Sequence, residues 1–190
     1  MVAVEMEEGL PLALLPVDER DPEALMRALL PLLQRLGVEV LVTDDLGSYR
    51  LLARKLGLRH QVCTFHLRRW AGRELRRLER ELGEGWAPML AQVRGLLRDR
   101  PPDGGMRLLG LWQGLTRLRP EPHSPLGRLK ALVLRLSEGW QSYCLHQHDP
   151  QVPTTNNRTE QAIGRPASGP RRCGASSPGP AWRRPSSCPT

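Results

Sequence analysis

The hydrophobic pattern divides the chain into a part in which strands alternate with helices and a part made of helices alone. Short runs rich in Val and Leu, bounded by turn residues, predict strands at residues 2–5, 12–15, 38–43 and 60–63. Helical periodicity predicts helices at residues 22–36 and 48–55, the first with Asp21 as its N-cap and Pro22 in its first turn. This order favours an α/β domain with parallel pairing of its later strands.

Beyond His66 the hydrophobic residues recur with helical periodicity for about eighty residues. The predicted helices are residues 67–82, 86–98, 106–118 and 126–144. The chain then returns to a helix that begins near Asn156. We therefore expect a partial α/β core over residues 1–66, a helical insertion over 67–150, a returning core helix over 151–165 and a disordered tail over 166–190.

Composition narrows the class of protein. Hydrophobic residues make up 39% of the chain, enough for a core, while aromatic residues make up 4%, which argues against base stacking as the main binding mode. No apolar run reaches the roughly 18 residues of a membrane span, so no membrane partner is expected. The acidic start of the chain does not have the form of a secretory signal, and we expect a cytoplasmic protein with reduced cysteines.

The formal net charge of +8 suggests a polyanionic partner, but the charge is unevenly distributed. Residues 166–190 contain no acid and carry four of these charges, on Arg171, Arg172, Arg183 and Arg184. The remaining +4 is spread over residues 1–165, which is mild for a nucleic-acid-binding protein.

Two acidic residues are candidates for a site. Asp44 follows a predicted buried strand, a usual place for site residues in α/β sheets, although an aspartate there is also typical of a turn or helix cap, a role that Asp45 fits better. Glu160 follows Asn157 at the spacing of a capping box, in which its carboxylate would fold back on the helix start. Both interpretations stay open for each residue.

A Cys63-x-x-His66 pair has the short spacing of metal ligands. Cys144 and His146 could complete a zinc site with this pair. The alternative is structural: a buried cysteine at the end of a strand and a histidine that caps the next helix.

The arginines of residues 67–82 also allow two interpretations. They could contact phosphates, or they could belong to a solvated helix in which arginine and glutamate alternate. The arginines of this segment are Arg68, Arg69, Arg73, Arg76, Arg77 and Arg80, and the interleaved acids are Glu74, Glu79 and Glu81.

Taken together and in order, these motifs resemble the Mutator-like transposases and their bacterial insertion-sequence relatives, over about residues 38–165. The matching segments are Val42-Thr43-Asp44-Asp45-x-x-Ser48-Tyr49, His60-Gln61-Val62-Cys63-x-x-His66-x-x-Arg69 and Thr155-Asn156-Asn157-x-x-Glu160, with a helical block before the last. The resemblance implies an RNase H-like core with an all-helical insertion. It also implies metal-dependent DNA cleavage and strand transfer, in which three carboxylates hold two Mg²⁺ or Mn²⁺ ions.

By this resemblance Asp44 is the second catalytic acid and Glu160 the third, and both are metal ligands. Cys63 and His66 form the C-x-x-H element of the group. The implied partners are DNA, as transposon ends and target, and a second copy of the protein. The residues expected to contact nucleic acid are Asn156, Asn157, Arg158 and Arg69.

The chain departs from this family at both ends. The strand with the first acid would lie upstream of Met1, and Asp18 is a poor substitute because it lies after the predicted hairpin. In residues 173–188, codons read one nucleotide earlier permit a basic loop and a Leu/Ala helix, which the family has after its third acid. We therefore expect an inactive transposase fragment, frameshifted near Arg165.

An alternative function is a small zinc-stabilised module that binds nucleic acid through a basic disordered tail. It would use Cys63, His66, Cys144 and His146 as zinc ligands.

Overall fold

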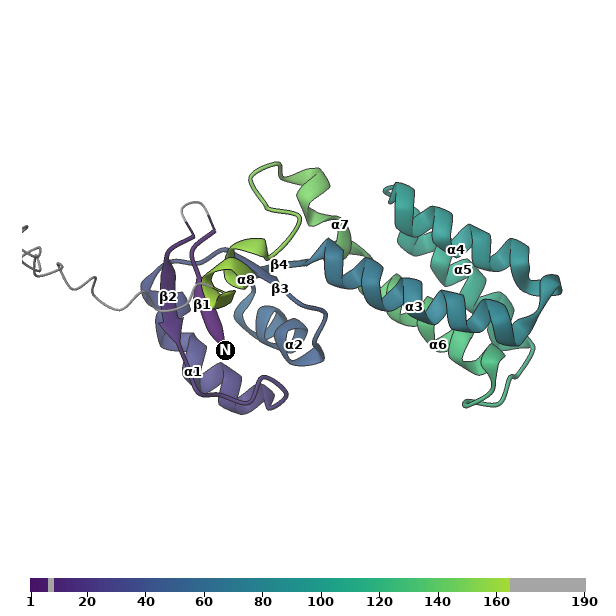
Figure 1. Cartoon of the computed structure of the whole chain (residues 1–190), viewed down its shortest axis with the longest axis horizontal. Coiled ribbons are helices and arrows are strands. Elements are labelled where there is room, and N and C mark those ends of the chain that lie inside the picture. Colours follow the sequence, from purple (N-terminus) through teal and green to yellow (C-terminus); the bar gives the residue numbers. More distant parts are fainter. Residues whose placement is uncertain (7–8, 165–190) are drawn as a thin grey trace, which may run out of the picture.

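The computed structural model describes residues 1–6 and 9–164. The chain folds into an α/β part at one end and a body of packed helices at the other (Figure 1). The α/β part consists of β1 (Val2–Val4), β2 (Pro11–Leu14), α1 (Pro22–Arg35), β3 (Val40–Thr43), α2 (Gly47–Leu56), β4 (Arg59–Val62) and α8 (Asn157–Gly164). The remaining elements are α3 (Thr64–Leu82), the 3₁₀ turn η1 (Glu84–Trp86), α4 (Ala87–Asp99), α5 (Gly104–Arg117), α6 (Pro125–Glu138) and α7 (Trp140–His148).

The first two strands form the predicted hairpin, and a capped helix follows it. β1 pairs antiparallel with β2, with Val2 opposite Leu14. The Asp21 carboxylate accepts hydrogen bonds from the backbone N–H groups of Glu23 and Ala24, at 2.9 and 3.1 Å, and so caps α1. The hairpin and the helix start that were predicted from the sequence are confirmed.

β3 and β4 pair in parallel through the crossover helix α2, as predicted. Their register places Thr43 opposite Val62, so both strands end at the same edge. In the described part of the chain this pair and the β1–β2 hairpin are two separate sheets. The fold is therefore mixed α/β, mostly helical, with small sheets.

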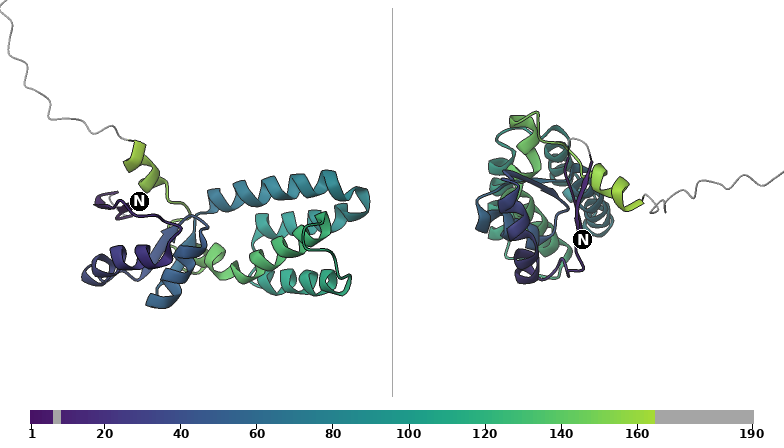
Figure 2. Two further views of the ribbon diagram at one scale, coloured as in Figure 1. Left: turned by 90° about the horizontal axis from the view of Figure 1, so that it is seen from below. Right: turned by 90° about the vertical axis from the view of Figure 1, so that its left-hand side faces the viewer.

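Two hydrophobic cores stabilise the two parts of the molecule. One lies under the small sheets and contains Leu25 and Leu29 of α1 with Tyr49 and Leu52 of α2. The other fills the helical body with buried leucines and valines, and α3 runs along its length (Figure 2). The two cores are separate, and β4 leads through Cys63 into α3 where the two parts join.

One predicted helix is wrong. The sequence predicts a single helix over residues 126–144, but the structure has α6 and α7 with a break at Gly139. A side chain at Gly139 would meet the ring of Tyr143, with the nearest ring carbon at 2.6 Å from its Cβ. The chain turns at this glycine, and the turn allows Trp140 to pack against Gly104 at the start of α5.

The ends of the helical body meet at its base. The backbone N–H of Thr64, at the start of α3, donates a hydrogen bond to the carbonyl of Thr154, at 2.9 Å. Residues 165–190, which include the predicted tail and frameshift, lie outside the described residues. In the part that the structure covers, none of the helices combines the length and the apolar character needed to cross a membrane.

Candidate functional site: a carboxylate pair facing His66

The first acid of the site lies where the parallel strands end. Asp44 directly follows β3, and the neighbouring strand β4 leads through Cys63 into α3. Because the two parallel strands end at one edge, the first turn of α3 lies beside Asp44. His66 belongs to that turn, and its side chain therefore points toward Asp44.

The second acid reaches the same place from far along the chain. Glu160 lies in the first turn of α8, which packs against β1. The hydrogen bond between Thr64 and Thr154 fixes the loop before α8 to the start of α3. The carboxylate of Glu160 is thereby held opposite His66.

These side chains form a small polar cluster, which we call the carboxylate site: Asp44, His66, Asn156 and Glu160. Nε2 of His66 lies 3.0 Å from Oε1 of Glu160 and 3.4 Å from Oδ1 of Asp44. Nδ2 of Asn156 donates a hydrogen bond to the same Asp44 oxygen, at 2.8 Å. The Asp44 and Glu160 side chains are 44% and 50% exposed, so the site opens to solvent.

The capping-box interpretation of Glu160 is wrong. α8 begins at Asn157, which places Asn156 at the N-cap position. The backbone N–H of Glu160 donates to the carbonyl of Asn156, while its carboxylate lies against His66. The side chain is thus free of the helix start and faces the carboxylate site.

A buried pair behind the site fixes the backbone of Asp44. The Thr43 hydroxyl donates a hydrogen bond to the Asp44 carbonyl at 2.8 Å, and its oxygen lies 2.8 Å from Nε2 of His60. Since that hydroxyl has one proton, His60 must donate from Nε2. Burial lowers the pKa of His60 to about 4, with a further contribution from Arg50, so the ring is neutral at pH 7.

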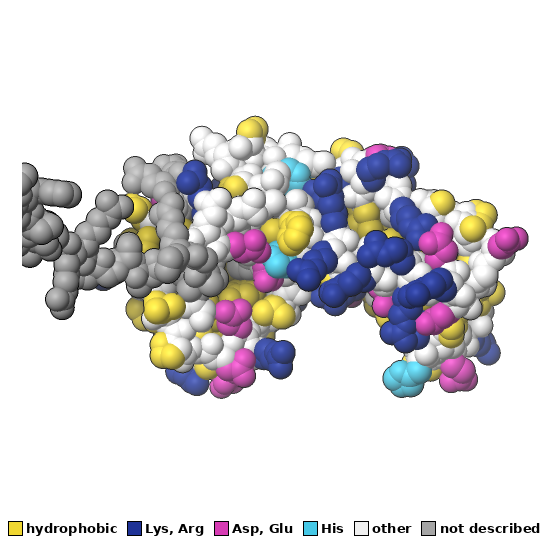
Figure 3. All heavy atoms as spheres, viewed as in Figure 1, with side chains coloured by type: hydrophobic (Ala, Val, Ile, Leu, Met, Phe, Trp, Pro, Cys, Tyr) yellow, Lys and Arg dark blue, Asp and Glu magenta, His cyan; other side chains and the backbone are white. Residues whose placement is uncertain are grey.

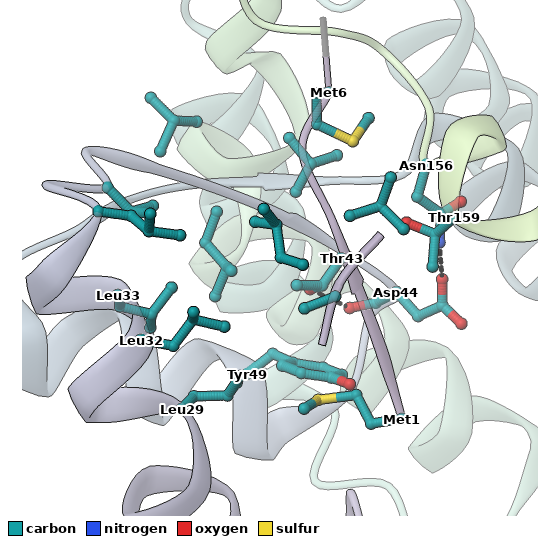
Figure 4. Close-up of a pocket in the computed structure, with 18 of the residues that line it drawn as sticks. Met1, Met6, Leu29, Leu32, Leu33, Thr43, Asp44, Tyr49, Asn156 and Thr159 are labelled. Atoms are coloured by element: carbon teal, nitrogen blue, oxygen red, sulfur yellow. Dashed lines mark hydrogen bonds between the residues drawn. The ribbon is translucent and has the colours of Figure 1, made fainter. Parts of the chain in front are cut away.

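A cavity of about 350 Å³ lies beside the site, between the hairpin and β3 (Figure 4). All four residues of β3 line it together with Ala3 and Val4 of β1, and Asp44 and Glu160 line its polar side. Consecutive residues of a strand point to opposite faces, so a cavity lined by all of them lies along the strand's edge. The cavity therefore separates the hairpin from the edge of β3 that pairs with no other strand in the described part of the chain.

The two carboxylates have the chemistry that a hard divalent cation requires, since Mg²⁺ and Mn²⁺ bind oxygen ligands. Oδ2 of Asp44 and Oε2 of Glu160 have no hydrogen-bond partner among residues 1–6 and 9–164. Over the same residues, no three His, Cys, Asp or Glu side chains are grouped so that they could hold a metal ion. The site offers two acidic ligands, with His66 between them.

The four zinc candidates do not gather around one point. Cys63 is fully buried at the junction of β4 and α3, and Cys144 is buried in the helical core. His66 faces the carboxylates, whereas Nδ1 of His146 lies 3.2 Å from the side-chain oxygen of Gln61. The structural interpretation of Cys63, a buried cysteine at a strand end, is confirmed.

Sequence reasoning missed the role of Asp45. It was expected to cap α2, but Leu46 occupies the N-cap position and no side chain caps that helix. The Asp45 side chain is 3% exposed and forms ion pairs with Arg50 and, at 2.7 Å, with Arg135 of α6. The pairing with Arg135 could not be found from local sequence, because Arg135 lies 90 residues away.

The expected nucleic-acid contacts lie at different places. Asn156 is buried and oriented toward Asp44, so its side chain positions that carboxylate. Asn157 and Arg158 are exposed, and the stem of Arg158 lies against Gly9 in the hairpin turn. Arg69 is exposed on α3, one turn beyond His66.

Comparison of the chain with protein-family models, curated proteins and solved structures gave no match. The function is therefore inferred from the carboxylate site and the surfaces around it.

Proposed function

We propose that this chain carries two of the three acids of a DDE-type DNA strand-transfer centre, as in the Mutator-like transposases and their bacterial insertion-sequence relatives. One observation carries the proposal: Asp44 and Glu160, separated by the whole helical body in the sequence, both lie against Nε2 of His66. Two carboxylates brought together from distant segments, at the end of a parallel strand, are the arrangement that two-metal phosphoryl transfer needs.

The arrangement of elements also supports an RNase H-like core. A hairpin and a helix precede a parallel strand pair, and the helical body separates that pair from the helix with the last acid. In this proposal the helical body is an insertion between Asp44 and Glu160, joined to the core at Thr64 and Thr154.

Each residue of the site has a distinct role in the proposed chemistry. Asp44 and Glu160 hold Mg²⁺ or Mn²⁺, which when bound activates the attacking oxygen and stabilises the leaving oxygen at a DNA phosphate. Asn156 donates to one oxygen of Asp44 and so turns the other toward solvent. His66 lies between the carboxylates, with its Nε2 in hydrogen-bond contact with Oε1 of Glu160 at 3.0 Å and 3.4 Å from Oδ1 of Asp44.

The proposal also predicts that the chain alone does not catalyse DNA strand transfer. Within the described residues two carboxylates, not three, meet at the site. With an incomplete ligand set we expect weak metal binding and no strand transfer by this polypeptide in isolation.

Manganese binding, measured by electron paramagnetic resonance, tests the proposal without requiring catalysis. We expect the wild-type chain to bind Mn²⁺ and Mg²⁺ to compete with it. Asp44→Asn and Glu160→Gln should each weaken Mn²⁺ binding by about tenfold, which corresponds to about 1.4 kcal/mol. Glu121→Gln is the matched control, since Glu121 is an exposed acid in the loop before α6.

Two outcomes would contradict the proposal. Either the wild-type chain fails to bind Mn²⁺, or the two site variants bind it as tightly as the control does. Stoichiometric zinc that is lost in Cys63→Ser would instead support the zinc-stabilised module.

A further inference from the structure

Four arginines of α3 form a continuous row on the surface. Arg69, Arg73, Arg76 and Arg80 follow one another at spacings of four, three and four residues, which places them on one face of a helix. All four are exposed. We call this row the arginine stripe.

The acids of α3 do not neutralise the stripe. Each of its three glutamates is held by an arginine outside the stripe. The ion pairs are Arg94–Glu79 at 2.6 Å, Arg77–Glu81 at 2.9 Å and Arg128–Glu74 at 3.3 Å. The stripe arginines form no ion pair within residues 1–6 and 9–164. The mixed arginine–glutamate pattern of this helix thus separates in space into glutamates that are paired with other arginines and a row of arginines that is not paired with them.

The stripe begins at the carboxylate site. His66 precedes Arg69 by three residues and lies on the same face of α3. In the space-filling view, Lys and Arg side chains gather over α3 and continue up to a histidine with acidic side chains beside it (Figure 3). A polyanion lying along the stripe would therefore reach Asp44 and Glu160.

We infer that the arginine stripe binds the sugar–phosphate backbone of duplex DNA and guides it to the carboxylate site. This inference rests on the proposed function for the choice of DNA as the polyanion. From Arg69 to Arg80 the helix rises about 16 Å, comparable to the axial rise of about five base pairs of duplex DNA. Arginine suits this role because its planar guanidinium can donate two hydrogen bonds to one phosphate.

The alternative of an anionic membrane surface fits α3 less well. A helix that lies on a membrane inserts an apolar face beside its basic one. The apolar face of α3 is instead packed into the core of the helical body, where Leu67, Ala71, Leu75 and Leu78 are buried. Duplex DNA requires no such face.

Metal-free binding of the full chain to a fluorescent DNA duplex of unrelated sequence tests the inference. The test variant is Arg73→Gln/Arg76→Gln, which removes two stripe charges. The control variant is Arg77→Gln/Arg98→Gln, which removes the same formal charge from arginines paired with Glu81 and Asp99. The arginines of residues 166–190 are unchanged in the wild-type chain and in both variants, so any DNA binding by them is the same in all three.

We expect the stripe variant to bind about 10- to 100-fold more weakly than the wild-type chain at about 0.1 M salt. The slope of log K against log salt should fall by about 1.8, since each phosphate contact contributes about 0.9. The control should lose less than threefold. Arg73→Lys/Arg76→Lys should restore most of the slope, and circular dichroism melting should show that all variants fold.

Equal losses in the stripe and control variants, or no binding by the wild-type chain, would overturn the inference. Binding to anionic phosphatidylserine vesicles but not to DNA would also overturn it. These results are separable from those of the metal experiment, which depends on Asp44 and Glu160. A wild-type chain that binds DNA through the stripe but does not bind Mn²⁺ would contradict the catalytic proposal and leave DNA binding by the stripe standing.

Discussion

Asp44 and Asp45 are neighbours in the sequence, but their carboxylates face different parts of the molecule. Asp44 is partly exposed and lies against Asn156 and His66 in the carboxylate site. The side chain of Asp45 is buried and paired with Arg135, so it joins the end of β3 to the helical body. We therefore expect one acid to serve the site and the other to serve stability.

Substitution of the two aspartates should separate these roles. Asp45→Asn leaves Arg50 and Arg135 facing a neutral group. Because the Asp45 carboxylate is buried while Arg135 is half exposed, the change should lower the free energy of unfolding by about 2 kcal/mol. Asp44→Asn should change it by no more than about 0.5 kcal/mol. Urea unfolding followed by circular dichroism measures both, and equal effects would contradict this division.

Asn156 should affect metal binding without being a ligand. Its amide holds Oδ1 of Asp44 at 2.8 Å, and residues that orient a ligand commonly contribute tenfold or more to metal affinity. We expect Asn156→Ala to weaken Mn²⁺ binding by about tenfold. Asn157→Ala is the matched control, because this exposed neighbour does not contact Asp44. A similar loss in both variants would point to a general disturbance of α8.

Stability should fall as the pH falls from 7 to 5 because of His60. Its pKa is lowered to about 4 in the folded chain, against about 6.5 when unfolded, so the unfolded chain takes up a proton in this range while the folded chain does not. We expect a loss of about 2 kcal/mol between pH 7 and pH 5. His146, whose pKa is also lowered by burial, contributes in the same direction.

The variant His60→Gln isolates this contribution. Glutamine can still donate a hydrogen bond to the Thr43 hydroxyl, but it does not titrate. Urea unfolding at both pH values should therefore show a smaller pH dependence in the variant. An unchanged dependence would mean that other groups produce it.

Two glycines of α5 should respond oppositely to alanine. A Cβ at Gly104 would lie 2.1 Å from the nearest ring carbon of Trp140, so Gly104→Ala should destabilise the fold by about 2 kcal/mol. Nothing lies within 4 Å of a Cβ at Gly110, and Gly110→Ala should stabilise the helix by about 0.5–1 kcal/mol. Thermal unfolding compares the two directly.

Much of the fold followed from local signals in the sequence. The cap formed by Asp21 and the apolar run that ends at Thr43 depend on adjacent residues, and the structure has the predicted helix and strand at both places. The break at Gly139 was not predicted, because the hydrophobic periodicity continues through this glycine and the packing of Trp140 on Gly104, which the break allows, joins segments far apart in the sequence.

The candidate site shows the same division between local and distant causes. Asp44, His66 and Glu160 were selected by motif and spacing, and the structure places Nε2 of His66 3.0 Å from Glu160 and 3.4 Å from Asp44. The pairing of Asp45 with Arg135 and the orientation of Asn156 toward Asp44 depend on tertiary contacts between distant segments, which residue type and spacing do not reveal.

The hydrogen bond between Thr64 and Thr154 has a consequence for how such chains can diverge. The polypeptide leaves the α/β part at Thr64 and re-enters it near Thr154, so the two ends of the helical body lie next to each other. The entropic cost of bringing the two ends of an inserted segment together grows only with the logarithm of the segment's length. Helices could therefore be gained or lost between α3 and α8 while Asp44 and Glu160 keep their separation in space. In related chains, the number of residues between the two acids should be a poor guide to kinship, and the short segments around each acid a better one.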